Sequence, residues 1–231
     1  MDIEKKIKGT LFHNDLTRLP FKYYGVYKIV KNEFWFVDIP RTSSSSIRKD
    51  LGEKFGIPYT KTKILGAIKA FKDHRTAIQM RNLLGKDNWE NLFTFTFVRN
   101  PWDRTFSMYH YRRKTGTIPA SMHFNDYVYE LFKAHTSSSD YFHFPRHYLG
   151  AADFVLNESG EIIVDFIGKY ENRREDLKRI EEEIGVDNIG SDIVRNLTPE
   201  GAKYHDHYTQ ETREIIEEIY QKDIQLFEYE F

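Results

Sequence analysis

The chain has 231 residues, of which 40% are hydrophobic, and this suits one domain of generous size with a real core. Its 34 Lys and Arg nearly balance its 35 Asp and Glu, and the net charge of −1 argues against nucleic acid or an anionic membrane as a partner. The absence of cysteine excludes disulfides, thiolate nucleophiles and zinc sites built on thiolates, and it fits the reducing cytoplasm.

The N-terminal residues 1–8 are charged and lack the apolar stretch of a signal peptide. No later segment approaches the roughly 18 apolar residues that are needed to span a bilayer. We therefore expect no membrane span, and we expect the protein in the cytoplasm.

The first expected strand is residues 33–39, a short run of aromatic and β-branched residues that stops at Pro40. A serine run follows, and then Ile47, Leu51 and Phe55 recur every four residues, as on one face of a helix. A glycine and a proline soon after Phe55 are expected to end that helix. The serine run therefore lies between a strand and a helix.

The same arrangement returns later in the chain. Residues 76–84 are expected to form a helix, and residues 91–98 a second buried strand rich in phenylalanine. Pro101 and Asp103 suit the first turn of a further helix, which is expected to continue to about Arg113.

Three more elements are expected towards the C-terminus. Residues 152–168 have the pattern of a hairpin, residues 173–184 that of a charged helix ending at Gly185, and residues 209–220 that of a last helix. Strands that alternate with helices favour an α/β fold, here a single domain whose mainly parallel central sheet is flanked by helices.

The segment Arg41-Thr42-Ser43-Ser44-Ser45-Ser46 has the character of an anion site. The first N–H groups of a helix have no intrahelical partner, and the helix dipole favours negative charge there. The hydroxyls can donate to an oxyanion, and Arg41 can hold two oxygens through its planar guanidinium. The alternative is a flexible serine loop or an ordinary helix cap. The glycines and the Lys-Ser/Thr ending of a nucleoside-triphosphate loop are missing.

Arg99 and Ser107 form a second candidate pair. Arg99 ends a strand, and Ser107 lies about two turns into the next helix, so the two side chains could converge on one phosphate at the carboxyl edge of the sheet. The alternative is that Arg99 forms a structural ion pair with Asp103 or Asp38.

These segments carry a resemblance. The run from Pro40 to Ser46 resembles the 5′-phosphosulfate loop of sulfotransferases that use 3′-phosphoadenosine 5′-phosphosulfate (PAPS), and the run from Phe97 to Ser107 resembles their 3′-phosphate segment. Both are most similar to the carbohydrate-type branch, with the heparan sulfate 2-O-sulfotransferases and many bacterial relatives. The segments around His74-Arg75-Thr76-Ala77, residues 165–172 and the C-terminal run are also similar to bacterial members.

The resemblance implies one sulfotransferase domain over residues 1–231, with a P-loop-like strand–loop–helix donor site, PAPS as the donor substrate and no metal. Residues 1–33 match poorly, and residues 114–148 are expected to be an acceptor-side insertion. The implied partner is a carbohydrate or another small molecule. The family loop usually has Lys where this chain has Arg41, which preserves the charge but puts general-acid help at the leaving oxygen in doubt.

The resemblance also implies a catalytic base, which is a histidine, or in some branches a glutamate, in carbohydrate-type relatives. His74 is the candidate, because it occupies the matching segment upstream of the strand that ends at Arg99. A surface histidine beside the helix that starts near Thr76 is the alternative, and Asp73 is a weaker competitor. Other histidines have structural readings as well as functional ones: His205 and His207 have the spacing of a metal-binding pair, and His143 and His147 could line an acceptor cleft.

Other residues of the second motif and of the helix that follows it could have either a structural or a binding role. Trp102 and Tyr109 are expected to be buried rather than to pack on a nucleotide. The basic residues 112–114 could meet an anionic acceptor or simply end a helix. Two other functions remain open: a nucleotide kinase of the phosphate-loop type, and a nucleotide- or glycan-binding module without catalysis.

Overall fold

The computed structural model describes residues 33–55, 74–136, 145–190 and 203–231. The chain divides into two compact units, residues 1–97 with 153–193 and residues 98–152 with 194–231, and each is described by itself. The glycine and proline expected to end the first helix, at positions 56 and 58, lie outside the described residues, as do Asp73 and His143.

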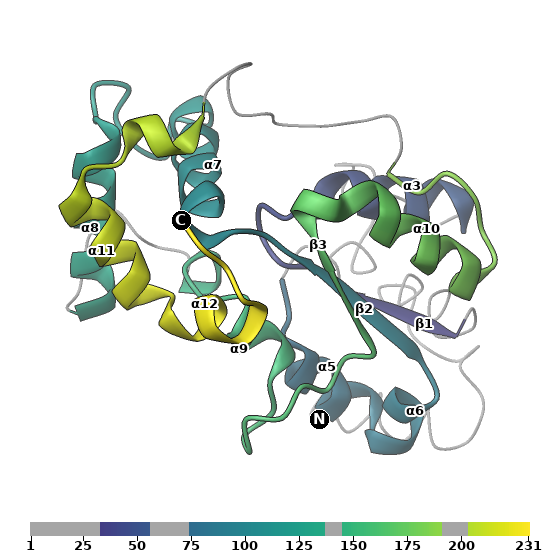
Figure 1. The fold of residues 1–231 in the computed structure, drawn as a ribbon. Helices are drawn as coiled ribbons and strands as arrows, with labels where there is room; N and C mark the ends of the chain where they lie inside the picture. Colours follow the sequence, from purple (N-terminus) through teal and green to yellow (C-terminus); the bar gives the residue numbers. More distant parts are fainter. Residues whose placement is uncertain (1–32, 56–73, 137–144, 191–202) are drawn as a thin grey trace, which may run out of the picture. The chain divides into compact units, whose positions relative to one another are not determined.

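The first unit is built on a small sheet in the order β1 (Phe34–Val37), β2 (Phe93–Val98) and β3 (Phe166–Lys169), drawn as arrows in Figure 1. The strands β1 and β2 pair in parallel, with Phe34 opposite Phe93 and Val37 opposite Thr96. Parallel pairing without an intervening hairpin needs a crossover, and helices occupy that stretch of the chain. The α/β fold class is confirmed.

Aromatic side chains form the core of this sheet. All four residues of β1 are buried, which is the pattern of a strand covered on both faces. The rings of Phe36 and Phe95 stack at a centroid distance of 5.2 Å across the β1–β2 pair. The Thr96 hydroxyl donates to the carbonyl of Val37 at 2.7 Å, so the buried polar group in this core is satisfied.

The described part of the first unit includes the helices α3 (Ser44–Lys54), α5 (Ala77–Leu84), α6 (Lys86–Glu90) and α10 (Arg173–Ile184). Figure 1 shows α3 and α10 on one side of the strands and α5 and α6 on the other. Helix α5 starts with a capping box, in which Thr76 and Gln79 each bind the backbone N–H of the other. Gly185 ends α10 with a φ of 69°, as expected from its glycine.

The hairpin expected at residues 152–168 is wrong in its first arm. Residues Ala152–Val155 form the short helix α9, and only one antiparallel bridge, between Leu156 and Ile162, joins the two arms. The backbone N–H groups of Ala151 and Ala152 donate to the Asp223 carboxylate at 2.6 and 2.8 Å, which caps the helix start. This distant carboxylate stabilises a helix where the local composition favours a strand.

The second unit is helical. It contains α7 (Pro101–Lys114), α8 (Phe124–Thr136), α11 (Gln210–Ile219) and α12 (Gln221–Phe227), with 3₁₀ turns at Pro145–His147 and Tyr204–His207; the 3₁₀ turn Tyr170–Asn172 belongs to the first unit. Its core is aromatic and aliphatic, and the buried members include Trp102, Phe106, Tyr127, Val128, Leu131 and Ile216. The helices α7 and α11 were expected, whereas α8 was not.

We expect that Gly168→Ala destabilises the first unit, because a Cβ at this position would lie 2.6 Å from Cε1 of the Phe97 ring. Overpacking of this kind costs roughly 1–3 kcal/mol of unfolding free energy, measurable by urea denaturation. The control is the same substitution in a Phe97→Leu background, where the missing ring should reduce the cost. An equal cost in both backgrounds would contradict the proposed clash.

Candidate functional site

The serine run joins β1 to α3, as expected from the sequence. Ser43 is the N-cap of α3, and the serines that follow it form the first turn of the helix. The side chains alternate in burial: Thr42, Ser44 and Ser46 are buried, whereas Arg41, Ser43 and Ser45 are half-buried. The half-buried set therefore has the greater access to a ligand, and the buried set shapes the loop.

The backbone of this loop is unusual for its residue types. Arg41 has a φ of 70° and Ser43 a φ of 71°, in the left-handed region that side chains other than glycine rarely adopt. The Thr42 hydroxyl donates to the carbonyl of Ile39 at 3.0 Å, and this hydrogen bond stabilises the turn from Ile39 to Thr42. Non-glycine residues in this region cost roughly 1–3 kcal/mol each and are concentrated at functional sites.

A buried carboxylate, Asp38, lies directly before the loop and is 3% exposed. Nη1 of Arg48, on α3, lies 2.8 Å from its Oδ2. Nδ1 of His74 lies 3.2 Å from the same Oδ2 and 3.0 Å from the backbone carbonyl of Asp38. The carboxylate thus joins the end of β1, the first two turns of α3 and the segment before α5.

The contacts determine the ionisation of this cluster. Burial on its own would raise the pKa of Asp38, but the charges of Arg48 and His74 and the hydrogen bond from His74 outweigh it, and the pKa is lowered. Burial opposes the charged form of His74, but the adjacent Asp38 carboxylate and its hydrogen bonds raise the pKa of the imidazole. Asp38 is therefore ionised at neutral pH, and it favours protonation of His74.

His74 was a candidate from the sequence, whereas its contact with Asp38 and the contact of Asp38 with Arg48 were not expected. His74 is not a cap of the next helix, because Thr76 fills that position and the His74 ring binds Asp38 instead. The available signal was an acidic residue at the very end of a fully apolar strand, where an unpaired charge is costly. Its partner Arg48 lies ten residues on, a separation that gives no local pattern.

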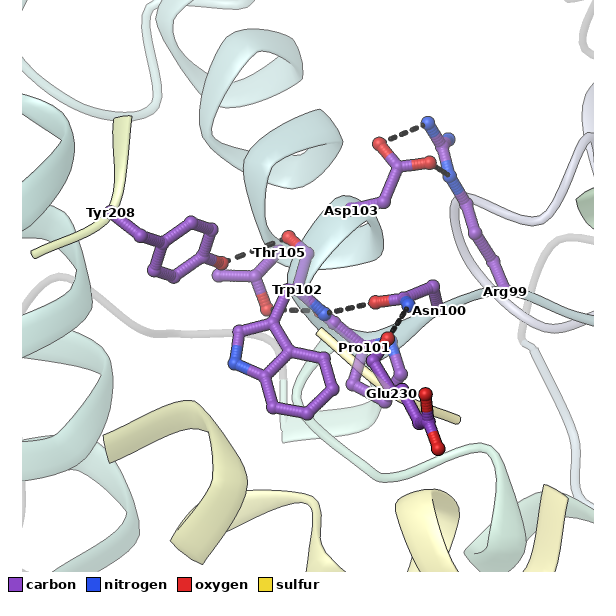
Figure 2. Close-up of polar contacts among 8 residues, drawn as sticks. All are labelled: Arg99, Asn100, Pro101, Trp102, Asp103, Thr105, Tyr208 and Glu230. Atoms are coloured by element: carbon purple, nitrogen blue, oxygen red, sulfur yellow. Dashed lines mark hydrogen bonds and ion pairs between the residues drawn. The ribbon is translucent and has the colours of Figure 1, made fainter. Parts of the chain in front are cut away.

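In the second unit, Arg99 lies between β2 and α7 and is 7% exposed. Figure 2 shows its guanidinium beside the Asp103 carboxylate: Nε donates to Oδ2 at 2.7 Å, and Nη2 donates to Oδ1 at 2.8 Å. This bidentate pair is the contact that the structural alternative anticipated. It fixes the plane of the guanidinium and uses two of its five N–H donors.

Asn100 fixes the same turn from the other side. Its Oδ1 accepts from the Trp102 N–H at 3.1 Å and caps α7, while its Nδ2 donates to the Glu230 carbonyl at 2.7 Å (Figure 2). Tyr208 donates from its hydroxyl to the Trp102 carbonyl at 2.9 Å. The segment that positions Arg99 is thus bound to the C-terminal residues and to the segment before α11.

The other expected residues of this segment lie along α7. Ser107 is 1% exposed and lies in the second turn of the helix. Trp102 and Tyr109 are buried, as expected. Of the three basic residues at the helix end, Arg112 is buried, with its guanidinium 4.8 Å from the centre of the Tyr148 ring, and Arg113 and Lys114 are exposed.

Two of the other candidate histidines, His205 and His207, lie against aromatic rings. His207 stacks on Phe106 at a centroid distance of 4.6 Å, and His205 stacks on Tyr204 at 3.8 Å. Among the described residues, no group of three or more His, Asp or Glu side chains is placed to hold a metal ion. Within the same residues, no helix combines the length and apolar character that crossing a membrane requires.

Comparison with known proteins identifies a family. A model of the sulfotransferase family matches residues 31–230, a range that contains both the β1–α3 loop and the segment from Arg99 to Ser107. An uncharacterized protein of Archaeoglobus fulgidus is 33% identical over 110 residues, which are 48% of this chain and 82% of that protein. No solved structure matches the chain.

We expect that Asn100→Ala lowers the unfolding free energy by about 2 kcal/mol, because it removes both the cap of α7 and the hydrogen bond to Glu230. Asn100→Ser is the matched control, since a serine keeps the capping oxygen but is too short to reach the Glu230 carbonyl. Urea denaturation should place it between the wild type and Asn100→Ala. Equal losses for the two variants would show that the cap contributes nothing.

Proposed function

Because the chain belongs to the sulfotransferase family, whose reaction is sulfuryl transfer, we propose that it takes the sulfuryl group from PAPS and transfers it to a hydroxyl or amine of an acceptor, foremost a carbohydrate. The observation that carries this proposal is the family match over residues 31–230, which contains a strand–loop–helix with an arginine and four serines at the helix start. The PAPS donor and the carbohydrate acceptor are the parts that need testing.

The β1–α3 loop is the proposed site for the 5′-phosphosulfate end of the donor. Arg41, half-buried and with a positive φ, would supply a fixed cation, and Ser43 and Ser45 would supply hydroxyl donors from the more accessible positions. The backbone N–H groups that start α3 add their dipoles. These features suit a doubly anionic group better than a neutral one.

Arg99 and Ser107 are the proposed contacts of the 3′-phosphate. The Asp103 carboxylate supports this role for Arg99, because two parallel hydrogen bonds hold the guanidinium in one orientation and reduce the entropy lost on binding. The same carboxylate carries a negative charge, which partly offsets the charge of Arg99 at the proposed phosphate position.

The proposed reaction places His74 as the general base. The acceptor oxygen forms a bond to sulfur while the bond from sulfur to the bridging phosphate oxygen breaks, and the acceptor proton passes to His74. Arg41 and the loop donors would stabilise the charge that develops on the leaving phosphate. Arginine keeps its proton at neutral pH, so its contribution is charge stabilisation rather than proton donation.

We expect the wild-type protein to bind 3′-phosphoadenosine 5′-phosphate without magnesium, as measured by isothermal titration calorimetry. Arg99→Ala should weaken this binding roughly 10- to 100-fold, the value of a charge-assisted hydrogen-bonded contact. Arg179→Ala, which removes an exposed arginine from α10, is the matched control and should bind like the wild type. Preference for adenosine triphosphate with magnesium would favour the kinase instead.

We expect that His74→Ala keeps the affinity for 3′-phosphoadenosine 5′-phosphate but lowers turnover about 10²–10⁴-fold, since only the base is lost. Turnover is followed with labelled PAPS and a panel of glycans, lipids and small metabolites. Wild-type turnover in this variant would remove His74 as the base. Nucleotide affinity with no transfer to any acceptor by the wild type would instead favour the binding module.

A further inference from the structure

The buried carboxylate of Asp38 contacts the ring of His74 in a way that selects one form of the imidazole. Two oxygens of the same residue lie near one ring nitrogen: the backbone carbonyl at 3.0 Å from Nδ1 and Oδ2 at 3.2 Å from it. A carbonyl and an ionised carboxylate only accept hydrogen bonds, so the hydrogen must be on Nδ1. The other nitrogen, Nε2, is then the one with a lone pair in the neutral ring.

We infer that Asp38 is a positioning residue for His74, holding the ring in its Nδ1–H tautomer so that Nε2 receives the acceptor proton. This inference deepens the proposed function and rests on it for the identity of the proton donor. The contact itself is a property of the first unit alone, because Asp38, Arg48 and His74 all belong to that unit.

The charges around the ring fit this role. When the acceptor oxygen gives its proton to Nε2, the ring becomes an imidazolium with a hydrogen on each nitrogen, and the carboxylate at 3.2 Å stabilises the new positive charge. Asp38 accepts from Nδ1–H throughout and does not itself take the proton, because the hydrogen bonds and cations around it keep its pKa lowered.

Arg48 binds the same carboxylate, and its positive charge has the opposite effect on the pKa of His74. Its Nη1 lies 2.8 Å from the Oδ2 that also faces His74, so the carboxylate is shared between a permanent cation and the imidazole. Among the described residues, Asp38 and Arg48 are the charged groups acting on the ring, the first raising the pKa of His74 and the second lowering it. Arg48 therefore offsets part of the effect of Asp38 on the pKa of His74, which is still raised overall.

The backbone of His74 supports the same conclusion. Its φ is 43°, a left-handed conformation in a residue that is not glycine. Such a conformation persists when surrounding contacts over-determine it, and Nδ1 makes two of them with Asp38, a hydrogen bond to the backbone carbonyl and an ion-pair contact with Oδ2. The ring is thus held through one nitrogen and one strained backbone position.

The test is nitrogen-detected histidine NMR of the ligand-free protein over a pH series. The signal of His74 is identified among the nine histidines by its loss in His74→Ala. At high pH we expect the nitrogen shifts of the Nδ1–H tautomer, which is the minor form of free histidine. We expect the titration midpoint above 6.5, the ordinary value for histidine. An Nε2–H tautomer in the wild type would overturn the inference without any variant.

Two variants should shift the midpoint in opposite directions, which a purely structural role would not do. Asp38→Asn removes the negative charge and should lower the midpoint of His74, whereas Arg48→Met removes the competing cation and should raise it. Glu53→Gln, which neutralises an exposed carboxylate of α3, is the control and should leave it unchanged. An unshifted midpoint in both variants would contradict the inference, and thermal unfolding reports whether each variant folds.

The kinetic consequence separates this inference from the proposed function. Asp38→Asn should lower kcat roughly 10- to 100-fold, the usual cost of losing a partner that orients a functional histidine, with nucleotide affinity retained. The acidic limb of its pH–rate profile should move to lower pH, because a weaker base loses its proton earlier. If the wild type neither binds the nucleotide nor turns over, the proposed function fails while the NMR result still decides the role of Asp38.

Discussion

The ionised carboxylate of Asp38, buried at the end of β1, is the constraint on which the first unit depends. A charge in this position is stable only with partners, and the carboxylate has two, from two different segments: Arg48 on α3 and His74 before α5. Removing any one partner leaves the carboxylate less compensated. The register of the loop and the orientation of the imidazole are therefore coupled through a single side chain.

In the second unit, the buried charged group is held in place by a neighbour in the sequence. Its candidate cation, Arg99, is bound by a carboxylate only four residues away, so its position follows from the first turn of α7 rather than from distant segments. Asn100 and Tyr208 then bind that turn to the rest of the unit. A local pair of this kind fixes the orientation of the guanidinium before any ligand binds, which suits the proposed contact between Arg99 and an anion.

The sequence predicted the strands and helices that are specified by their own residues. The strand β1 has a continuous apolar run, α3 and α7 have repeating apolar positions or a proline in the first turn, and each was found. Helix α8 was missed, although Phe124, Tyr127, Val128 and Leu131 recur at helical spacing and are buried. Helix α9 could not be found locally, because the Asp223 carboxylate that caps it lies about seventy residues away in the chain.

At the candidate site, the residue types predicted which chemical groups are present, but they did not predict the backbone conformation. Arg41, Ser43 and His74 were chosen for their guanidinium, hydroxyl and imidazole, and all three have a positive φ that no local pattern announced. Glycine would adopt these conformations without the cost of roughly 1–3 kcal/mol per residue, but it would remove the very group that each position needs. The sequence with the least backbone strain at these positions therefore differs from the sequence that the proposed function requires. The strain is tolerated because Thr42 and Asp38 hold the flanking backbone in place.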